Sequence, residues 1–257
     1  MAVCQCSVWR FSGSGLILEG GIAWKGGGSG IEGVVRSLLV LLGLMVALPA
    51  LGAESEVELR KRMSGKEGRI LFVGNSYSFK VPGVVARMVR ERGGKVVVEQ
   101  VTRGGWTLRK HAESEETLEK IREGKWDVIV LQEQSQMPSF GKKARERDLN
   151  PFAKALADEA RKAGAQPVFF LTWGRRDGDQ RNNPEDTYAG MQSRLETGYR
   201  EAAVSAGSAL VVPVGKAWAR EMKAGRGKGL YAKDGSHPTA EGVRLSAKVF
   251  VEFFFGK

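Results

Sequence analysis

Residues 69–78 read RILFVGNSYS, and this stretch decides the fold. Its first half, Arg69–Val73, is an apolar run without polar alternation, which predicts a strand buried on both faces of a sheet. Gly74 then permits a tight turn. Ser76 follows this turn, shortly before a segment with helical spacing at Val81–Arg92. A buried strand, a glycine turn and a helix together predict the first unit of a parallel α/β sheet.

The same alternation of strand and helix continues to the end of the chain. Four further strands are predicted at Lys95–Thr102, Trp126–Leu131, Pro167–Trp173 and Ala209–Val214. Further helices are predicted at Ser114–Glu123, Pro151–Ala163, Thr187–Ala206 and Thr239–Phe255. Right-handed crossovers between such strands give a three-layer α/β/α domain with a five-stranded parallel sheet, which we expect over residues 66–257.

The composition is that of an ordinary globular protein. The chain has 257 residues, of which 42% are hydrophobic and 27% charged, so a wholly disordered or fibrous protein is excluded. The formal net charge of +11 would allow contact with anionic polysaccharide, a membrane surface or nucleic acid. No nucleic-acid-binding module is found, so we expect a basic soluble surface and no nucleic-acid partner.

The first 53 residues are expected to be a leader that is removed. Leu38–Leu48 is an uncharged apolar run after Arg36 and before small residues, the pattern of a signal peptide. The run is too short for a membrane-spanning helix, and a buried core helix is the alternative. Cys4 and Cys6 would leave with the leader. We therefore expect a secreted or periplasmic monomer without disulfides and without a stable membrane span.

Candidate chemistry lies where the strands end, because ligands of an open parallel sheet bind beyond the carboxyl ends of its strands. Ser76 can be a nucleophile with backbone N–H groups nearby for an oxyanion, or a helix-capping serine. Gly104 and Gly105 follow the second strand. They let the backbone approach a ligand and donate an N–H, or they form a flexible turn.

Two further strand ends carry polar side chains. The block Gln132–Gln136 follows the third strand, where a glutamine amide can donate to a developing oxyanion or lie in a solvated loop. Asp234 and His237 precede the last helix in the sequence DGSHPT. An aspartate three residues before a histidine can fold back on the imidazole, fix its tautomer and make it a general base. A simple helix-start loop is the alternative.

The motifs, in their order along the chain, resemble the SGNH (GDSL-type) hydrolase superfamily over residues 69–255. They are GNS after the first strand, a glycine pair after the second, an amide-bearing block after the third, and D-x-x-H-P before the last helix. The resemblance implies a flavodoxin-like fold and a carboxylic ester hydrolase that needs no metal or organic cofactor. It also implies that Ser76 is the nucleophile, His237 the general base and Asp234 its orienting acid.

The resemblance implies an oxyanion hole as well. Its donors would be the N–H groups of Ser76 and of Gly104 or Gly105, and the amide of Gln134. The sequences GNSYS and LQEQS depart from the commoner GDS and G-x-N-D, and resemble a divergent secreted bacterial branch in which the glutamine is part of the pattern. Whether Gln132 or Gln134 faces the pocket stays open.

Several residues near the strand ends are candidates for substrate binding. They are Asn75, Trp106, His111, Gln132 and Trp173. The two tryptophans can stack on a pyranose ring, and Arg175, Arg176 and Arg181 in the loop after the fourth strand can contact an anionic sugar. Ordinary loop and core packing is the alternative for each tryptophan and arginine.

The expected substrate is a carboxylic ester, most simply an O-acetyl or other acyl group on a carbohydrate. A lipid esterase or thioesterase of the same superfamily and a non-catalytic glycan-binding module on this fold are the alternatives. Asp177-Gly178-Asp179 resembles half of a calcium loop but lacks the other ligands, so no metal is expected.

Overall fold

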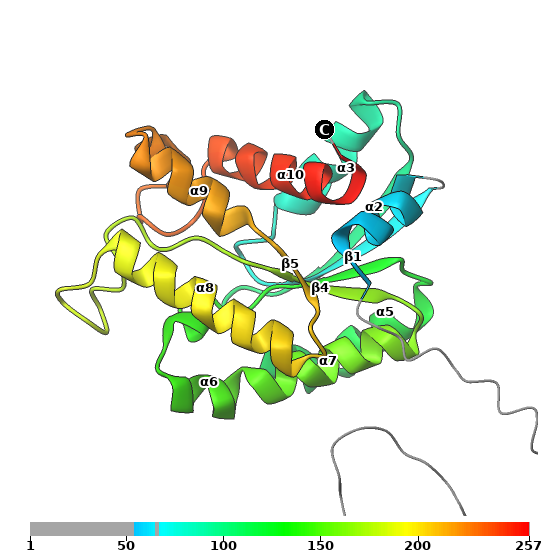
Figure 1. The fold of residues 1–257 in the computed structure, drawn as a ribbon, viewed down its shortest axis with the longest axis horizontal. Helices are drawn as coiled ribbons and strands as arrows, with labels where there is room; N and C mark the ends of the chain where they lie inside the picture. The colour runs from blue at the N-terminus through cyan, green and yellow to red at the C-terminus, as the bar shows by residue number, and fades with distance from the viewer. Residues whose placement is uncertain (1–53, 65–66, 257) are drawn as a thin grey trace, which may run out of the picture. The chain divides into compact units, whose positions relative to one another are not determined.

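The computed structural model describes residues 54–64 and 67–256 (Figure 1). The leader predicted at residues 1–53 lies outside the described residues. Within the described part, no helix has the length and apolar character needed to cross a membrane.

A five-stranded parallel sheet forms the centre of the fold. Its strands are β1 (Gly68–Gly74), β2 (Val96–Thr102), β3 (Val128–Leu131), β4 (Gln166–Phe170) and β5 (Leu210–Val212). They lie in the order β2-β1-β3-β4-β5, and every neighbouring pair is parallel. This is the order of flavodoxin-like doubly wound domains, so the predicted fold class is confirmed.

Helices cover both faces of the sheet (Figure 1). One face carries α2 (Glu56–Ser64), α3 (Val81–Glu91), α9 (Val214–Lys223) and α10 (Ala240–Phe255). The other carries α4 (Leu108–Ala112), α5 (Glu115–Glu123), α6 (Lys142–Asp148), α7 (Asn150–Lys162) and α8 (Tyr188–Ser205). Short 3₁₀ turns, η2 (Met137–Ser139) and η3 (Gly227–Leu230), lie in the loops.

Strand β1 shows why the sheet needs two helical layers. Successive side chains of a strand point to opposite faces. Ile70 and Phe72 pack with the helices of the first face, whereas Leu71 and Val73 pack with those of the second. All four side chains are fully buried, which explains the apolar run without alternation in the sequence.

Helix α2 was not expected from the sequence, and it belongs to the folded domain. Leu59 and Met63, one helical turn apart, are buried in the core with residues of α3 and α10. The folded part of the chain therefore extends N-terminal of the boundary predicted at residue 66. Helices α4, α6 and α9 were also not expected.

The register of the strands brings the predicted site blocks to one edge of the sheet. Gly74 at the end of β1 pairs with Thr102 at the end of β2, and Leu131 of β3 lies beside both β1 and β4. The loops that follow these strands therefore start side by side.

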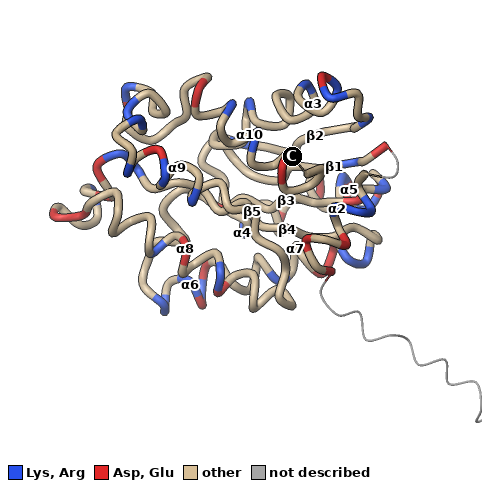
Figure 2. The backbone as a smooth tube through the Cα atoms, turned by 45° about the horizontal axis from the view of Figure 1, so that its top comes forward, with Lys and Arg blue, Asp and Glu red and all other residues tan. Residues whose placement is uncertain are grey.

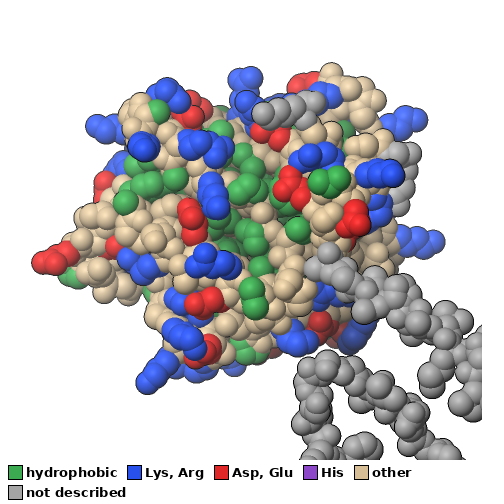
Figure 3. All heavy atoms as spheres, viewed as in Figure 1, with side chains coloured by type: hydrophobic (Ala, Val, Ile, Leu, Met, Phe, Trp, Pro, Cys, Tyr) green, Lys and Arg blue, Asp and Glu red, His purple; other side chains and the backbone are tan. Residues whose placement is uncertain are grey.

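Charged side chains are distributed over the surface rather than gathered on one basic face. In the views of Figures 2 and 3, Lys and Arg are interspersed with Asp and Glu. Many of them form exposed ion pairs, such as Arg103 with Glu116 and Arg226 with Glu221.

Candidate active site

A chain of hydrogen bonds joins Ser76, His237 and Asp234. The Ser76 hydroxyl lies 2.8 Å from Nε2 of His237, across 161 residues of sequence. On the other side of the ring, Nδ1 of His237 lies 2.5 Å from Oδ2 of Asp234. Because the carboxylate can only accept, Nδ1 carries the proton, and Nε2 is left to accept the serine proton.

The loop of Asp234 is folded around its own carboxylate. Oδ1 accepts the backbone N–H groups of Ser236 at 2.9 Å and of His237 at 3.0 Å. Partial burial opposes ionisation, but the hydrogen bonds from His237 and Ser236 outweigh it and lower the pKa of Asp234 to about 2. Gly235 takes a positive φ of 66° at the tip of the loop. Asp234 is therefore an ionised hydrogen-bond acceptor for the imidazole at neutral pH.

The side chains of His237, Asp234 and Ser76 lie at an accessible surface of the protein. The side chains of His237 and Asp234 are 45% and 49% exposed, and Ser76 is partly exposed. The three side chains can therefore meet a substrate without an opening of the core.

Gln132 fixes the turn that carries Ser76 through hydrogen bonds to its neighbours. Oε1 of Gln132 accepts the N–H of Asn75 and the hydroxyl of Ser78, each at 2.9 Å. A Cβ atom on Gly74 would lie only 2.6 Å from the same oxygen, so the close approach requires glycine there. The nucleophile turn and the third block are thus one packed unit.

Asn75 joins this unit to the loop after β2. Its Nδ2 donates to the carbonyl of Trp106 at 2.9 Å, and its Oδ1 accepts from Nε2 of Gln132 at 3.0 Å and from the N–H of Tyr77. Asn75 and Gln132 are buried, with their amides bonded within the protein. Their predicted role in substrate binding is therefore wrong, because both amides fix the loops instead.

An aromatic stack supports the histidine loop. The rings of Tyr77 and Trp173 are stacked 4.7 Å apart, and Trp173 stacks in turn on Trp218 at 4.0 Å. The Tyr77 hydroxyl lies 2.5 Å from Oγ of Ser236, and Nε1 of Trp173 donates to the carbonyl of Ser236 at 3.0 Å. The residue before His237 is therefore held at two points.

Trp173 is wholly buried in this stack, which contradicts its predicted contact with a sugar ring. Tyr77 and Trp218 were not expected as supporting residues. The signal for Tyr77 was its place in the GNSYS block, directly after Ser76.

His111 is a second residue that the structure places away from the surface. It is fully buried, with Nε2 against the carbonyl of Gly74 at 2.8 Å and Nδ1 against the hydroxyl of Thr117 at 3.0 Å. Burial lowers the pKa of His111, so the ring is neutral. The prediction that His111 lines the pocket is wrong, because the ring anchors the end of β1. Trp106, packed edge-on against His111, is only partly buried.

Three backbone N–H groups lie in the loops beside Ser76. Arg103–Trp106 form a turn closed by the N–H of Trp106 on the carbonyl of Arg103, with Gly105 at φ +71°. Among the described residues, the N–H groups of Ser76, Gly104 and Gly105 donate no hydrogen bond. These donors are available to a ligand.

The side chain of Gln134 is folded onto its own loop. Oε1 accepts the N–H groups of Gln136 at 2.8 Å and Met137 at 3.2 Å, which caps η2. Nε2 makes only longer contacts of 3.3–3.4 Å, to Gln136 and Ser135. The amide is partly exposed, and its role as an oxyanion donor stays a prediction.

The loop after β4 is tied to the third block through Asp179. This buried carboxylate accepts from Nε2 of Gln136 at 2.8 Å and contacts Nη1 of Arg175 at 3.4 Å. Arg176 pairs with Asp177 and packs its guanidinium on Gly235 in the histidine loop. Arg175 and Arg176 thus lie on loops that border the serine and histidine blocks. No cluster of three or more potential metal-ligating side chains occurs within residues 54–64 and 67–256.

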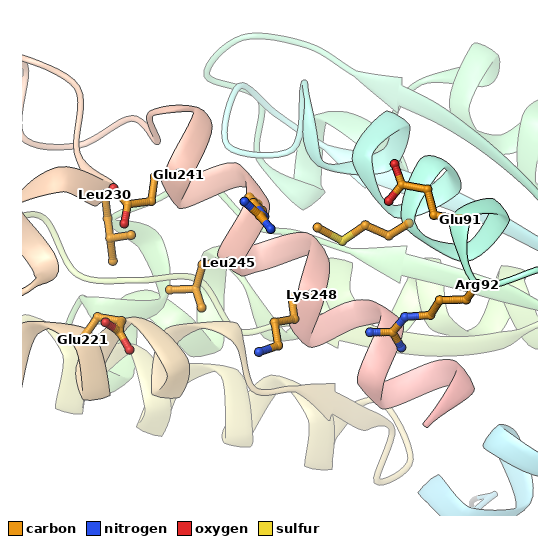
Figure 4. Close-up of a pocket in the computed structure, with 9 residues that line it drawn as sticks. Glu91, Arg92, Glu221, Leu230, Glu241, Leu245 and Lys248 are labelled. Atoms are coloured by element: carbon orange, nitrogen blue, oxygen red, sulfur yellow. The ribbon is translucent and has the colours of Figure 1, made fainter. Parts of the chain in front are cut away.

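A hollow of about 560 Å³ lies elsewhere, over α10 and between the ends of α3 and α9 (Figure 4). Its lining is of mixed charge and includes Arg92, Glu221, Glu241, Arg244 and Lys248. Neither Ser76 nor His237 lines it. The hollow is therefore distinct from the site described above.

No family model and no curated protein matches the sequence. Solved structures do match. A candidate SGNH hydrolase from Slackia heliotrinireducens is 30% identical with a TM-score of 0.60, over 73% of this chain and 99% of that one. A DUF4886 family protein from Bacteroides uniformis is 16% identical with a TM-score of 0.65, over 75% of this chain and 84% of that one.

The acetyl xylan esterase AlAXEase is 14% identical with a TM-score of 0.57, over 71% of this chain and 97% of that one. This match and that to the Bacteroides uniformis protein show a shared fold. The match at 30% identity, to the candidate SGNH hydrolase, spans nearly the whole of that protein. The chain therefore belongs to the SGNH (GDSL-type) hydrolase superfamily.

Proposed function

We propose that this protein is a serine esterase in which Ser76, His237 and Asp234 form the catalytic triad. The observation that carries the proposal is the 2.8 Å contact between the Ser76 hydroxyl and Nε2 of His237, backed by the carboxylate of Asp234 on Nδ1. Nucleophile, base and orienting acid are thus in hydrogen-bond range in the order that acyl transfer needs.

In this mechanism His237 takes the proton of Ser76 as the serine oxygen attacks the ester carbonyl. Asp234 stabilises the imidazolium that forms. His237 then protonates the leaving alcohol, and the acid remains bound to Ser76 as an acyl group. A water molecule, deprotonated by the same imidazole, releases the acid and restores the serine.

The oxyanion formed in both steps needs donors beside Ser76. The N–H groups of Ser76 and of the Gly104-Gly105 turn are proposed for this role, because none of them is engaged within the described protein. The Gln134 amide would join them by turning its Nε2 from its long contacts. Losing one such donor typically costs about 10²–10³-fold in turnover.

For the substrate we propose an O-acetyl or other acyl group on a carbohydrate. The half-exposed His237 and Asp234 support a substrate that is too large to enter a buried channel. The fold shared with an acetyl xylan esterase is consistent with this class. Arg175 and Arg176, in loops next to the site, would favour an anionic sugar.

Export would bring the enzyme to such a substrate. The signal-peptide pattern at Leu38–Leu48 supports secretion or a periplasmic location. We propose that the exported enzyme acts as a monomer.

The test compares residues 54–257 with the variants Ser76→Ala and Ser193→Ala, the latter an exposed serine on α8. Each is given p-nitrophenyl acetate, longer-chain p-nitrophenyl esters, acetylated xylan and acetylated polygalacturonate. We expect turnover in the parent and in Ser193→Ala, and near-complete loss in Ser76→Ala, because of these two serines it is Ser76 whose hydroxyl contacts a histidine.

Each other outcome decides against part of the proposal. Equal turnover in Ser76→Ala would reject the triad. A preference for long acyl chains would assign the enzyme to lipid esters or thioesters. Folded parent protein that binds glycans but hydrolyses none of these esters would instead be a glycan-binding module.

A further inference from the structure

Glu133, between the two glutamines of the third block, is a buried carboxyl group that the proposed mechanism does not use. Its side chain has no exposed surface. No lysine, arginine or histidine of the described residues acts on it electrostatically. A buried carboxylate without a cation is costly, so its position calls for an explanation.

The contacts of Glu133 join two loops that are distant in the sequence. Both carboxyl oxygens are in range of the N–H of Leu108, at 3.2 and 3.3 Å. Oε1 also accepts the N–H of Gln134 at 2.5 Å. Leu108 is the first residue of α4, directly after the turn that contains Gly104 and Gly105. The carboxyl group thus ties the second block to the third.

The hydrogen bond between the N–H of Leu108 and Glu133 lies at the N-terminus of α4. The first N–H groups of a helix have no partner within the helix and need acceptors from elsewhere. The Thr107 hydroxyl accepts the N–H of Lys110, and Glu133 accepts that of Leu108. The start of α4, and with it the end of the glycine turn, is therefore fixed from the third block.

The groups packed around Glu133 leave its charge uncompensated. Tyr199 of α8 accepts the N–H of Glu133 through its hydroxyl, at 3.2 Å, and burial raises the pKa of that phenol. His111, on the same helix as Leu108, has both ring nitrogens bonded to Thr117 and Gly74, and burial lowers its pKa. Burial raises the pKa of Glu133 to about 8, against weaker opposing effects of the N–H groups of Gln134 and Leu108. Burial without a cation therefore favours the neutral form of the carboxyl over the ionised one.

We propose that Glu133 is a positioning residue: as a neutral acid it holds the glycine turn and Gln134 in place beside Ser76, and its ionisation opens that junction and lowers turnover at alkaline pH. This rests on the proposed esterase function, because the two loops supply the proposed oxyanion donors. An ionised Glu133 would have to gain water or a cation, and both require the loops to separate.

The kinetic test compares the parent with Glu133→Gln, Glu133→Leu and the exposed control Glu113→Gln at the end of α4. Leucine keeps the volume but removes both acceptors, so we expect kcat to fall about 10²-fold with KM little changed. Glutamine keeps an acceptor and cannot ionise. We expect it to retain most of kcat at pH 7, and to keep it above pH 8, where the parent and Glu113→Gln lose it.

A second measurement needs no catalysis. In the Ser76→Ala background, hydrogen exchange of peptides covering residues 103–108 is followed at pH 7 and pH 9 and corrected for intrinsic rates. We expect extra exchange at pH 9 with Glu133 and none with Glu133→Gln. This comparison decides the question even if Glu133→Leu does not fold.

Coinciding alkaline profiles for the parent and Glu133→Gln, or exchange that does not differ between them, would overturn the inference. Absence of turnover in the parent would reject the proposed function, whereas the exchange measurement would still decide whether Glu133 ties the loops.

Discussion

Tyr77 links the nucleophile to the general base without taking part in proton transfer. Its backbone follows Ser76, its ring packs on Trp173 and edge-on against His237, and its hydroxyl meets Ser236. Tyr77, which follows Ser76, is therefore hydrogen-bonded to Ser236, which precedes His237. Such support restricts the relative motion of two loops that are far apart in the sequence.

We expect Tyr77→Phe to lower the free energy of unfolding by about 1 kcal/mol, because the Ser236 hydroxyl loses its partner while the ring stack remains. We also expect kcat to fall several-fold as the His237 loop loosens. Tyr188→Phe is the matched control, since the Tyr188 hydroxyl is buried without a hydrogen-bond partner among the described residues. Urea unfolding and ester turnover measure both effects. Equal losses in the two variants would contradict the supporting role of Tyr77.

The proposed triad could be predicted from the sequence because its residues sit in turns whose spacing constrains them. Asp234 and His237 are three residues apart in a loop with Gly235, so a carboxylate–imidazole contact needs no information from the rest of the fold. The directions of Gln132 and Gln134 could not be predicted. These directions depend on the backbone path of the loop after β3. In the structure, the side chain of Gln132 points inward and binds the turn of Asn75, whereas that of Gln134 binds its own loop.

At the scale of elements, helix α2 shows how tertiary packing can give a helix that its pattern does not predict. Its sequence, EVELRKRMS, has few apolar residues and a weak helical periodicity. Leu59 and Met63 nevertheless enter the core beside α10, and Arg60 reaches the carbonyl of Phe253. Strands β1 and β3 were predictable because each is buried on both faces and reads as an apolar run. Strand β2 lies at the edge of the sheet and is only partly buried, but its β-branched run still predicts a strand.

We expect Leu59→Ala to destabilise the protein by about 2–5 kcal/mol, because a fully buried side chain is removed and leaves a cavity. Val57→Ala, on the same helix at 71% exposure, should change the stability by less than about 0.5 kcal/mol. Thermal or urea unfolding of residues 54–257 measures both. A small effect of Leu59→Ala would mean that α2 is not part of the cooperative unit and that the domain begins near residue 66.

In the molecule as a whole, the loops of the proposed active site and the buried carboxyl group of Glu133 lie at the same edge of the parallel sheet. The register that brings the loops after β1, β2 and β3 together also encloses Glu133 between them. Most of the other charged side chains lie at the surface, many of them in exposed ion pairs that contribute little to stability, whereas a few such as Asp179 are buried. The pH dependence of folding near neutrality should therefore be dominated by a few enclosed groups.

Glu133 determines whether its contribution to the stability rises or falls with pH. Its pKa rises from 4.5 to about 8 on folding, so between these values the native state holds a proton that the unfolded chain has lost. Stability therefore falls as pH rises through this window, by up to about 1.4 kcal/mol per pH unit, and the effect levels off above about pH 8. Glu133→Gln cannot bind this proton, so we expect its unfolding free energy to stay flatter with pH.

The measurement is the difference in unfolding free energy between the parent and Glu133→Gln, from urea unfolding at several values between pH 5 and 9. The difference should shift steadily in favour of Glu133→Gln as pH rises, whereas Glu113→Gln should track the parent because its carboxylate is exposed. Asp234 cannot imitate this trend. Its pKa is lowered to about 2, so its contribution is complete above about pH 4 and is lost only in strong acid. A difference that is constant from pH 5 to 9 would mean that Glu133 is ionised throughout, with water or a cation inside the junction of the two loops.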